Sequence, residues 1–100
     1  MHFTLTYDLG AEGERRTAIE NQIQEILKPY KLVKKLTTFY IIYVPTVENW
    51  ELLRGALTNF QKTISEKFYF IMSPPMSGGT YNGVIPKDEW AAINEITKKA

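Results

Sequence analysis

Asp8 is the residue of this sequence that is best placed to do chemistry. It ends an alternating segment in which its side chain shares a polar side with Thr4 and Thr6. Side chains at strand ends can converge on a ligand. A carboxylate there can coordinate Mg²⁺, or Mn²⁺ as a substitute, because such hard cations need only one or two protein carboxylates beside water and phosphate oxygens. The competing interpretation is that Asp8 caps the following helix or binds amides of the turn.

A second carboxylate for a catalytic or metal site is not evident within one chain. Asp88 opens the last predicted helix, where Asp is a favoured N-cap residue. A two-fold symmetric dimer that brings two copies of Asp8 together would supply the missing carboxylate. We therefore expect a catalytic, metal-binding Asp8 only in a homodimer.

A group of cations without acidic neighbours is the second chemical feature. The segment 26–47 contains four lysines and no acidic residue: Lys28, Lys31, Lys34 and Lys35. A basic stripe with interleaved aromatic side chains can follow a phosphate backbone and stack on bases. The predicted nucleic-acid-binding residues are lysines of this segment, two arginines that could lie nearby, and one tyrosine: Arg15, Arg16, Lys31, Lys34, Lys35 and Tyr40. Alternatively, the lysines protect a solvated strand edge from association.

Composition restricts the classes of function. The 100 residues include 12 basic and 11 acidic side chains, and the net charge of +1 lacks the strong basic footprint of most nucleic-acid binders. The absence of cysteine excludes thiol nucleophiles, iron–sulfur clusters and cysteine-ligated zinc. No segment reaches the roughly 18 apolar residues that span a membrane. We expect one cytoplasmic domain over residues 1–100.

Hydrophobic periodicity predicts the elements that position these residues. Strict alternation favours a strand over residues 1–8. Apolar residues at i, i+4, i+7 and i+8 favour a helix from about Gly13 to Leu27. Residues 31–44 are rich in β-branched and aromatic types, which favours one long strand or a hairpin that turns near residues 37–38.

The second half of the chain continues this alternation of strands and helices. Thr46 is a plausible N-cap for a helix with a regular apolar stripe over residues 50–64. Residues 68–72 form another predicted strand, and residues 80–85 could add a short edge strand. A last helix begins at Pro86.

The order of these elements predicts a ferredoxin-like α+β fold, β-α-β-β-α-β, with an antiparallel sheet, two helices on one face and an additional C-terminal helix. Residues 1–75 would form the core of this domain. The strands at 39–44 and 68–72 carry large apolar side chains on both faces, whereas two helices cover only one. We expect the other face to contact the terminal helix, a ligand or a partner, of which a second copy is the simplest.

Three segments occur in the order seen in a known family. They are Phe3–Leu9, Lys35–Tyr40 and Lys67–Ile71, and the predicted first helix has early arginines. Over residues 1–75 the chain resembles the small CRISPR-associated spacer-acquisition proteins and the related virulence-associated protein D ribonucleases. The resemblance implies a ferredoxin-like homodimer that binds nucleic acid, with metal-dependent endonuclease activity in some members. It also implies that Asp8 lies near the dimer axis and that a strand at 80–85 completes the partner's sheet.

The chain also departs from that family's pattern. Thr37 and Thr38 stand where the family often has a serine-containing motif, no acidic residue follows Tyr40, and the helix after Pro86 has no clear counterpart. Besides an enzyme acting on a small molecule in the cleft between the sheet and the last helix, for which the sequence offers no acid–base pair, two hypotheses about function stay open. One is a homodimer that binds RNA or DNA, with or without Mg²⁺-dependent cleavage. The other is a non-catalytic dimer that binds a protein or a small ligand through its open sheet face.

Overall fold

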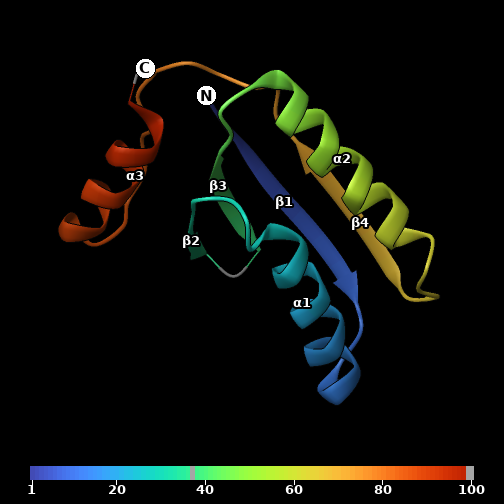
Figure 1. The fold of residues 1–100 in the computed structure, drawn as a ribbon. Coiled ribbons are helices and arrows are strands. Elements are labelled where there is room, and N and C mark those ends of the chain that lie inside the picture. Colours follow the sequence, from blue (N-terminus) through green and yellow to red (C-terminus); the bar gives the residue numbers. More distant parts are fainter. Residues whose placement is uncertain (37, 99–100) are drawn as a thin grey trace.

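A computed structural model describes residues 1–36 and 38–98, and the side chains of all of these except residues 35 and 36 (Figure 1). The elements are, in chain order, β1 (His2–Gly10), α1 (Gly13–Leu27), β2 (Leu32–Leu36), β3 (Phe39–Tyr43), α2 (Val47–Gln61), β4 (Lys67–Met72), a 3₁₀ turn (Lys87–Glu89) and α3 (Trp90–Thr97). The strands form an antiparallel sheet in the order β2-β3-β1-β4. This topology confirms the predicted ferredoxin-like α+β fold.

The lysine-rich segment forms a hairpin rather than one long strand. β2 and β3 pair antiparallel from Leu32 opposite Ile42 to Leu36 opposite Phe39, with a shift of register between Lys34 and Leu36. The hairpin puts β3 next to β1 in the middle of the sheet. Alternate residues of β3 therefore face opposite sides of the sheet.

Helix α2 begins where the sequence predicts. The Thr46 hydroxyl accepts a hydrogen bond from the backbone N–H of Asn49 at 3.2 Å and donates one to the Asn49 side-chain oxygen at 2.7 Å. This cap satisfies one of the backbone donors that the first helical turn leaves without a partner. The cap thus sets the start of the helix that lies over β4 (Figure 1).

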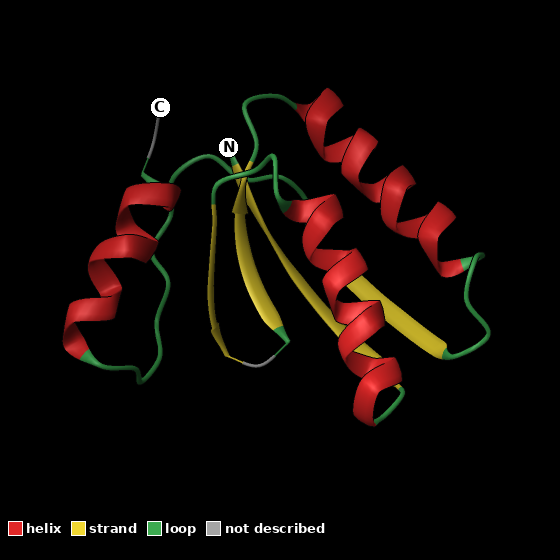
Figure 2. Ribbon diagram, turned by 60° about the horizontal axis from the view of Figure 1, so that its bottom comes forward, coloured by secondary structure: helices red, strands yellow, loops and turns green. Residues whose placement is uncertain are grey.

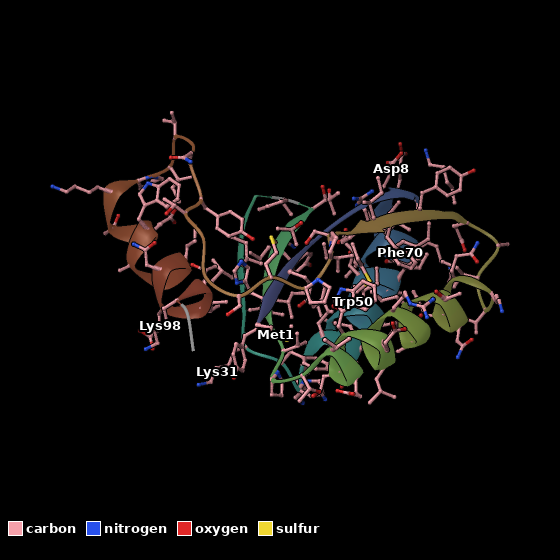
Figure 3. All side chains as sticks on the ribbon, turned by 90° about the horizontal axis from the view of Figure 1, so that it is seen from above. Met1, Asp8, Lys31, Trp50, Phe70 and Lys98 are labelled. Atoms are coloured by element: carbon pink, nitrogen blue, oxygen red, sulfur yellow. The ribbon has the colours of Figure 1, made fainter. Side chains whose placement is uncertain are left out.

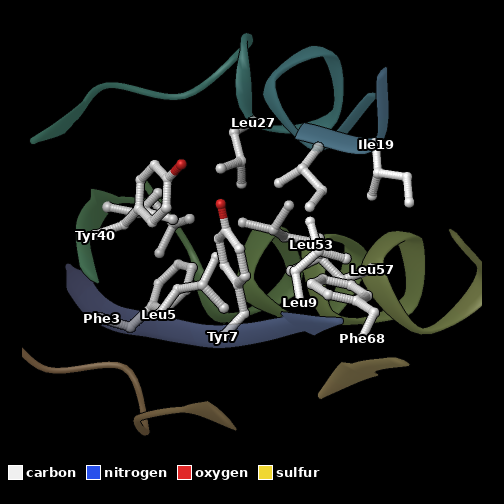
Figure 4. Close-up of a cluster of buried hydrophobic side chains, with 13 residues drawn as sticks. Phe3, Leu5, Tyr7, Leu9, Ile19, Leu27, Tyr40, Leu53, Leu57 and Phe68 are labelled. Atoms are coloured by element: carbon white, nitrogen blue, oxygen red, sulfur yellow. The ribbon is translucent and has the colours of Figure 1, made fainter. Parts of the chain in front are cut away.

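Helices α1 and α2 lie on the same face of the sheet, which we call the inner face (Figure 2). Figure 3 shows Trp50 of α2 and Phe70 of β4 between the strands and these helices. The close-up in Figure 4 shows the buried cluster that joins the two layers. Its members come from alternate strand positions and from one stripe of each helix: Phe3, Leu5, Tyr7, Leu9, Ile19, Ile23, Leu27, Tyr40, Ile42, Val44, Leu53, Leu57 and Phe68. The predicted alternation of β1 is therefore confirmed.

The opposite, outer face of the sheet is only partly covered. Helix α3 lies apart from the other two helices, at the β2 end of the sheet (Figure 2). Its residue Ile93 forms a second buried cluster with Val33 of β2 and Ile41 of β3. The terminal helix therefore covers the β2–β3 half of the outer face.

The edge strand predicted at residues 80–85 is wrong, because this segment has no regular secondary structure. The chain after β4 is instead tied to β1 by paired backbone hydrogen bonds of 2.8 Å between His2 and Met76. The buried His2 ring then contacts the Tyr81 ring, with 5.5 Å between ring centroids. Tyr81 and Ile85 pack against the outer cluster and so cannot run along an open strand edge.

Thr46→Ala should lower the free energy of unfolding by about 1 kcal/mol, the usual cost of removing a threonine N-cap. Urea denaturation followed by far-UV circular dichroism measures the change. The matched control is Thr17→Ala on the exposed surface of α1, where alanine has the better helix propensity and no cap is removed. Equal destabilisation by the two substitutions would contradict the capping role.

Candidate functional site

Asp8 lies on the outer face of β1, on the side of the sheet opposite α1 and α2 (Figure 3). The prediction that it ends the strand is wrong by two residues, since β1 continues to Gly10. The N-cap position of α1 is Glu12, so Asp8 does not cap that helix either. Its exposed carboxylate pairs with the Lys67 ammonium at 2.8 Å, and this hydrogen bond and charge lower the pKa of Asp8.

Asp8 has no second metal-ligating side chain grouped with it among the described residues of one chain. In the part of the chain that the structure describes, no group of three or more His, Asp or Glu side chains is placed to hold a metal ion. Asp88 does not cap α3 as predicted, since it lies in the preceding 3₁₀ turn and Glu89 takes the N-cap position. Asp8 alone, paired with Lys67, is a poor ligand set for a cation.

The two predicted phosphate-binding arginines are occupied by contacts within the chain. Arg15 binds Glu66 through two hydrogen bonds of 2.7 and 3.0 Å, and this contact lowers the pKa of Glu66 to about 2. Arg16 pairs with Glu20 at 2.7 Å and donates to the backbone carbonyl of Leu9 at 2.9 Å. Arg16 thereby fixes the turn from β1 into α1, and a phosphate would have to compete with Glu66 for Arg15 and with Glu20 for Arg16.

Tyr40, the predicted base-stacking residue, offers no exposed ring in this structure. It is fully buried on the inner face, and its hydroxyl accepts a hydrogen bond of 2.7 Å from the Gln24 side-chain amide. The Tyr40 ring lies 6.1 Å from that of Tyr7, nearly parallel to it. Tyr40 is part of the core because the even-numbered residues of β3 face the helices.

The predicted lysines do not form one continuous track. Lys34 is exposed beside α1, shares a shallow groove with Arg16 and Glu20, and holds its ammonium 5.4 Å from the Tyr40 ring centroid. Lys31 lies near α3, where it borders a different groove with Lys98 (Figure 3). The side chain of Lys35 lies outside the described residues. The structure thus places Lys31 and Lys34 in separate grooves.

The sequence predicts an open apolar sheet face without naming its residues, and the structure shows this face as an exposed strip along β1 and β4. We call this set the outer strip: Thr6, Asp8, Lys67, Tyr69 and Ile71. Tyr69 and Ile71 remain 66% and 72% exposed, and the Lys67 ammonium lies 5.7 Å from the Tyr69 ring centroid. The alternation in β4 was the available signal, because Phe68 faces the core and Tyr69 must then face outward.

Comparisons of the chain with protein-family models, curated proteins and solved structures found no match. No helix among the described residues is long and apolar enough to cross a membrane. The fold itself defines the class, a ferredoxin-like α+β protein with an added C-terminal helix.

Lys67→Met should raise the pKa of Asp8 toward its ordinary value, because the ammonium stabilises the ionised carboxylate. An NMR titration of the side-chain carboxyl carbon measures this shift. Because the pKa is lowered in the folded state, the contact stabilises the fold above the ordinary pKa of aspartate, and this contribution is lost as the pH falls through the folded-state value. Lys62→Met, which removes another exposed lysine, is the control. An unchanged Asp8 titration in Lys67→Met would disprove the ion pair.

Proposed function

We propose that this protein is a homodimer that binds nucleic acid and that its subunits meet through the outer strip. The exposure of two large apolar side chains side by side, Tyr69 and Ile71, carries the proposal. The third helix covers the other half of this sheet face and leaves these residues uncovered. A contiguous exposed apolar patch that polar residues border is typical of a protein interface.

A second copy of the chain fits the outer strip for reasons of charge and of backbone pairing. In a two-fold interface each patch meets itself, so a patch with one acid and one base can exchange partners with its copy. Asp8 and Lys67 are such a pair. Among the described residues, β4 pairs only with β1, so its other edge remains open to the partner. This edge would add area toward the roughly 800 Å² that each partner of a stable complex buries.

Three exposed lysines support the proposal that the ligand is a nucleic acid. Lys28, Lys31 and Lys34 take part in none of the ion pairs found among the described residues. Two subunits would double the number of such cations, which suits a chain whose own net charge is only +1. The resemblance of residues 1–75 to the spacer-acquisition proteins also favours this ligand. The proposal includes the cytoplasmic location that the sequence predicts.

Cleavage of RNA or DNA is the enzymatic extension of this proposal. It would require Mg²⁺ held between the Asp8 carboxylates of two subunits, because one subunit does not provide a ligand set. Lys67 would have to release Asp8 first, since an ammonium at 2.8 Å competes with a cation for the same carboxylate. Binding without cleavage needs neither condition and is the function that the geometry supports better.

Ile71→Asp should raise the dissociation constant of the dimer by more than about tenfold, because a charge would be buried between two apolar surfaces. Light scattering coupled to size-exclusion chromatography over a concentration series measures the effect. Leu52→Asp is a matched control, since Leu52 is 67% exposed on α2, far from the outer strip. A monomeric wild-type protein, or equal effects of both substitutions, would refute dimerisation through this face.

Affinity for a labelled RNA or DNA oligonucleotide should fall steeply with salt, because phosphate contacts release counterions. Fluorescence anisotropy over a salt series gives the slope. Lys34→Gln should reduce that slope by about one, which is the contribution of a single lysine–phosphate pair, whereas Lys62→Gln should leave it unchanged. Absence of binding, or an affinity that salt does not change, would favour the non-catalytic dimer that binds a protein or small ligand.

A further inference from the structure

A cavity of about 270 Å³ lies between the outer face of the sheet and the C-terminal segment. Val33 and Ile41 of the hairpin form its floor, and Ile93 of α3 closes one side. The segment 81–85 forms another wall, with Val84 fully exposed to solvent. The cavity is separate from the outer strip, which lies along β1 and β4.

Three aromatic side chains line this cavity: Phe39, Tyr81 and Trp90. They come from three different parts of the chain, namely β3, the loop after β4 and the start of α3. Aromatic rings pack well against other rings, in offset-stacked or edge-to-face arrangements. This lining therefore favours a planar ring over a flexible aliphatic chain.

None of the ten lining residues carries a formal charge. An ionised ligand would lose its hydration without gaining a counter-charge, which is costly. An enclosed apolar cavity of roughly 150 Å³ holds a benzene molecule, which sets the scale for this more open cavity. A cavity of about 270 Å³ is thus suited to a neutral ligand of one or two rings.

We propose that this cavity is a binding site for a neutral aromatic molecule of one or two rings. The Tyr81 hydroxyl is closed to solvent and so is not open to a ligand in the cavity. Tyr81 therefore contributes its ring to the lining. The proposal does not depend on dimerisation or on nucleic-acid binding, since it uses none of the residues assigned to them.

Naphthalene and 2-naphthol are suitable probes because both are neutral at pH 7 and differ by one hydroxyl. Titration of the full chain, followed by methyl NMR, should show saturable shifts at Val33, Ile41 and Ile93 with both probes. Tyr81→Phe keeps the ring and should leave the binding of both probes unchanged, whereas Tyr81→Ala removes the ring and should weaken both at least severalfold. Unchanged binding of both probes in Tyr81→Ala would overturn the proposal.

Ile85→Trp adds bulk to the cavity wall and should abolish saturable binding of both probes. Leu52→Trp makes a comparable change on the exposed surface of α2 and should have no effect. If Ile85→Trp no longer unfolds cooperatively, the smaller Ile85→Phe should still weaken binding at least severalfold. Shifts at Tyr69 and Ile71 instead of the cavity, or no saturable shift in the wild-type protein, would overturn the proposal.

Discussion

The structure depends on the need to cover a sheet whose strands carry apolar side chains on both faces. Helices α1 and α2 bury most of the inner face, with Phe3, Leu5 and Tyr40 fully excluded from solvent. The third helix has eight residues and reaches only the β2–β3 half of the outer face. The remaining half leaves Tyr69 and Ile71 exposed. An antiparallel sheet tolerates one solvated face, but large apolar residues on that face favour a partner.

Several charged side chains form contacts within the chain itself. Arg15 and Arg16 join α1 to the loop before β4 and to the end of β1, and Lys67 joins β4 to Asp8. These pairs are solvent-exposed, and such pairs contribute little to stability. They do, however, remove cations from any phosphate-binding surface. The sequence has nearly equal numbers of acidic and basic side chains, and in the structure most arginines contact carboxylates.

The C-terminal segment gives the fold a feature that its strand order does not require. The segment 73–86 crosses to the outer face, anchored by His2, and α3 packs there by few side chains. Loose packing between a short helix and a sheet leaves the cavity that Phe39 and Trp90 line. The same segment thus covers half of one face and creates a concave surface on it.

Local chemistry alone predicted much of this fold. The sequence predicted the features that depend on neighbouring residues. They are the alternation in β1, the stripes of α1 and α2, the Thr46 cap and the position of β4. The candidate site was predicted less well, because the roles of Asp8, Arg15 and Tyr40 depend on partners distant in the sequence. Spacing does not reveal that Glu66 meets Arg15 or that Lys67 meets Asp8.

By itself the sequence determined the strands and helices of the core, their order and hence the ferredoxin-like topology. Only the tertiary structure decided which side of β3 and β4 faces the helices, where the chain after β4 goes and which cations retain a free charge. The reason is that helix and strand formation responds to residues a few positions apart, whereas burial and ion pairing are set by which elements pack together. Tyr40 illustrates the difference: its type predicts a strand, and the packing of α1 against β3 places it in the core.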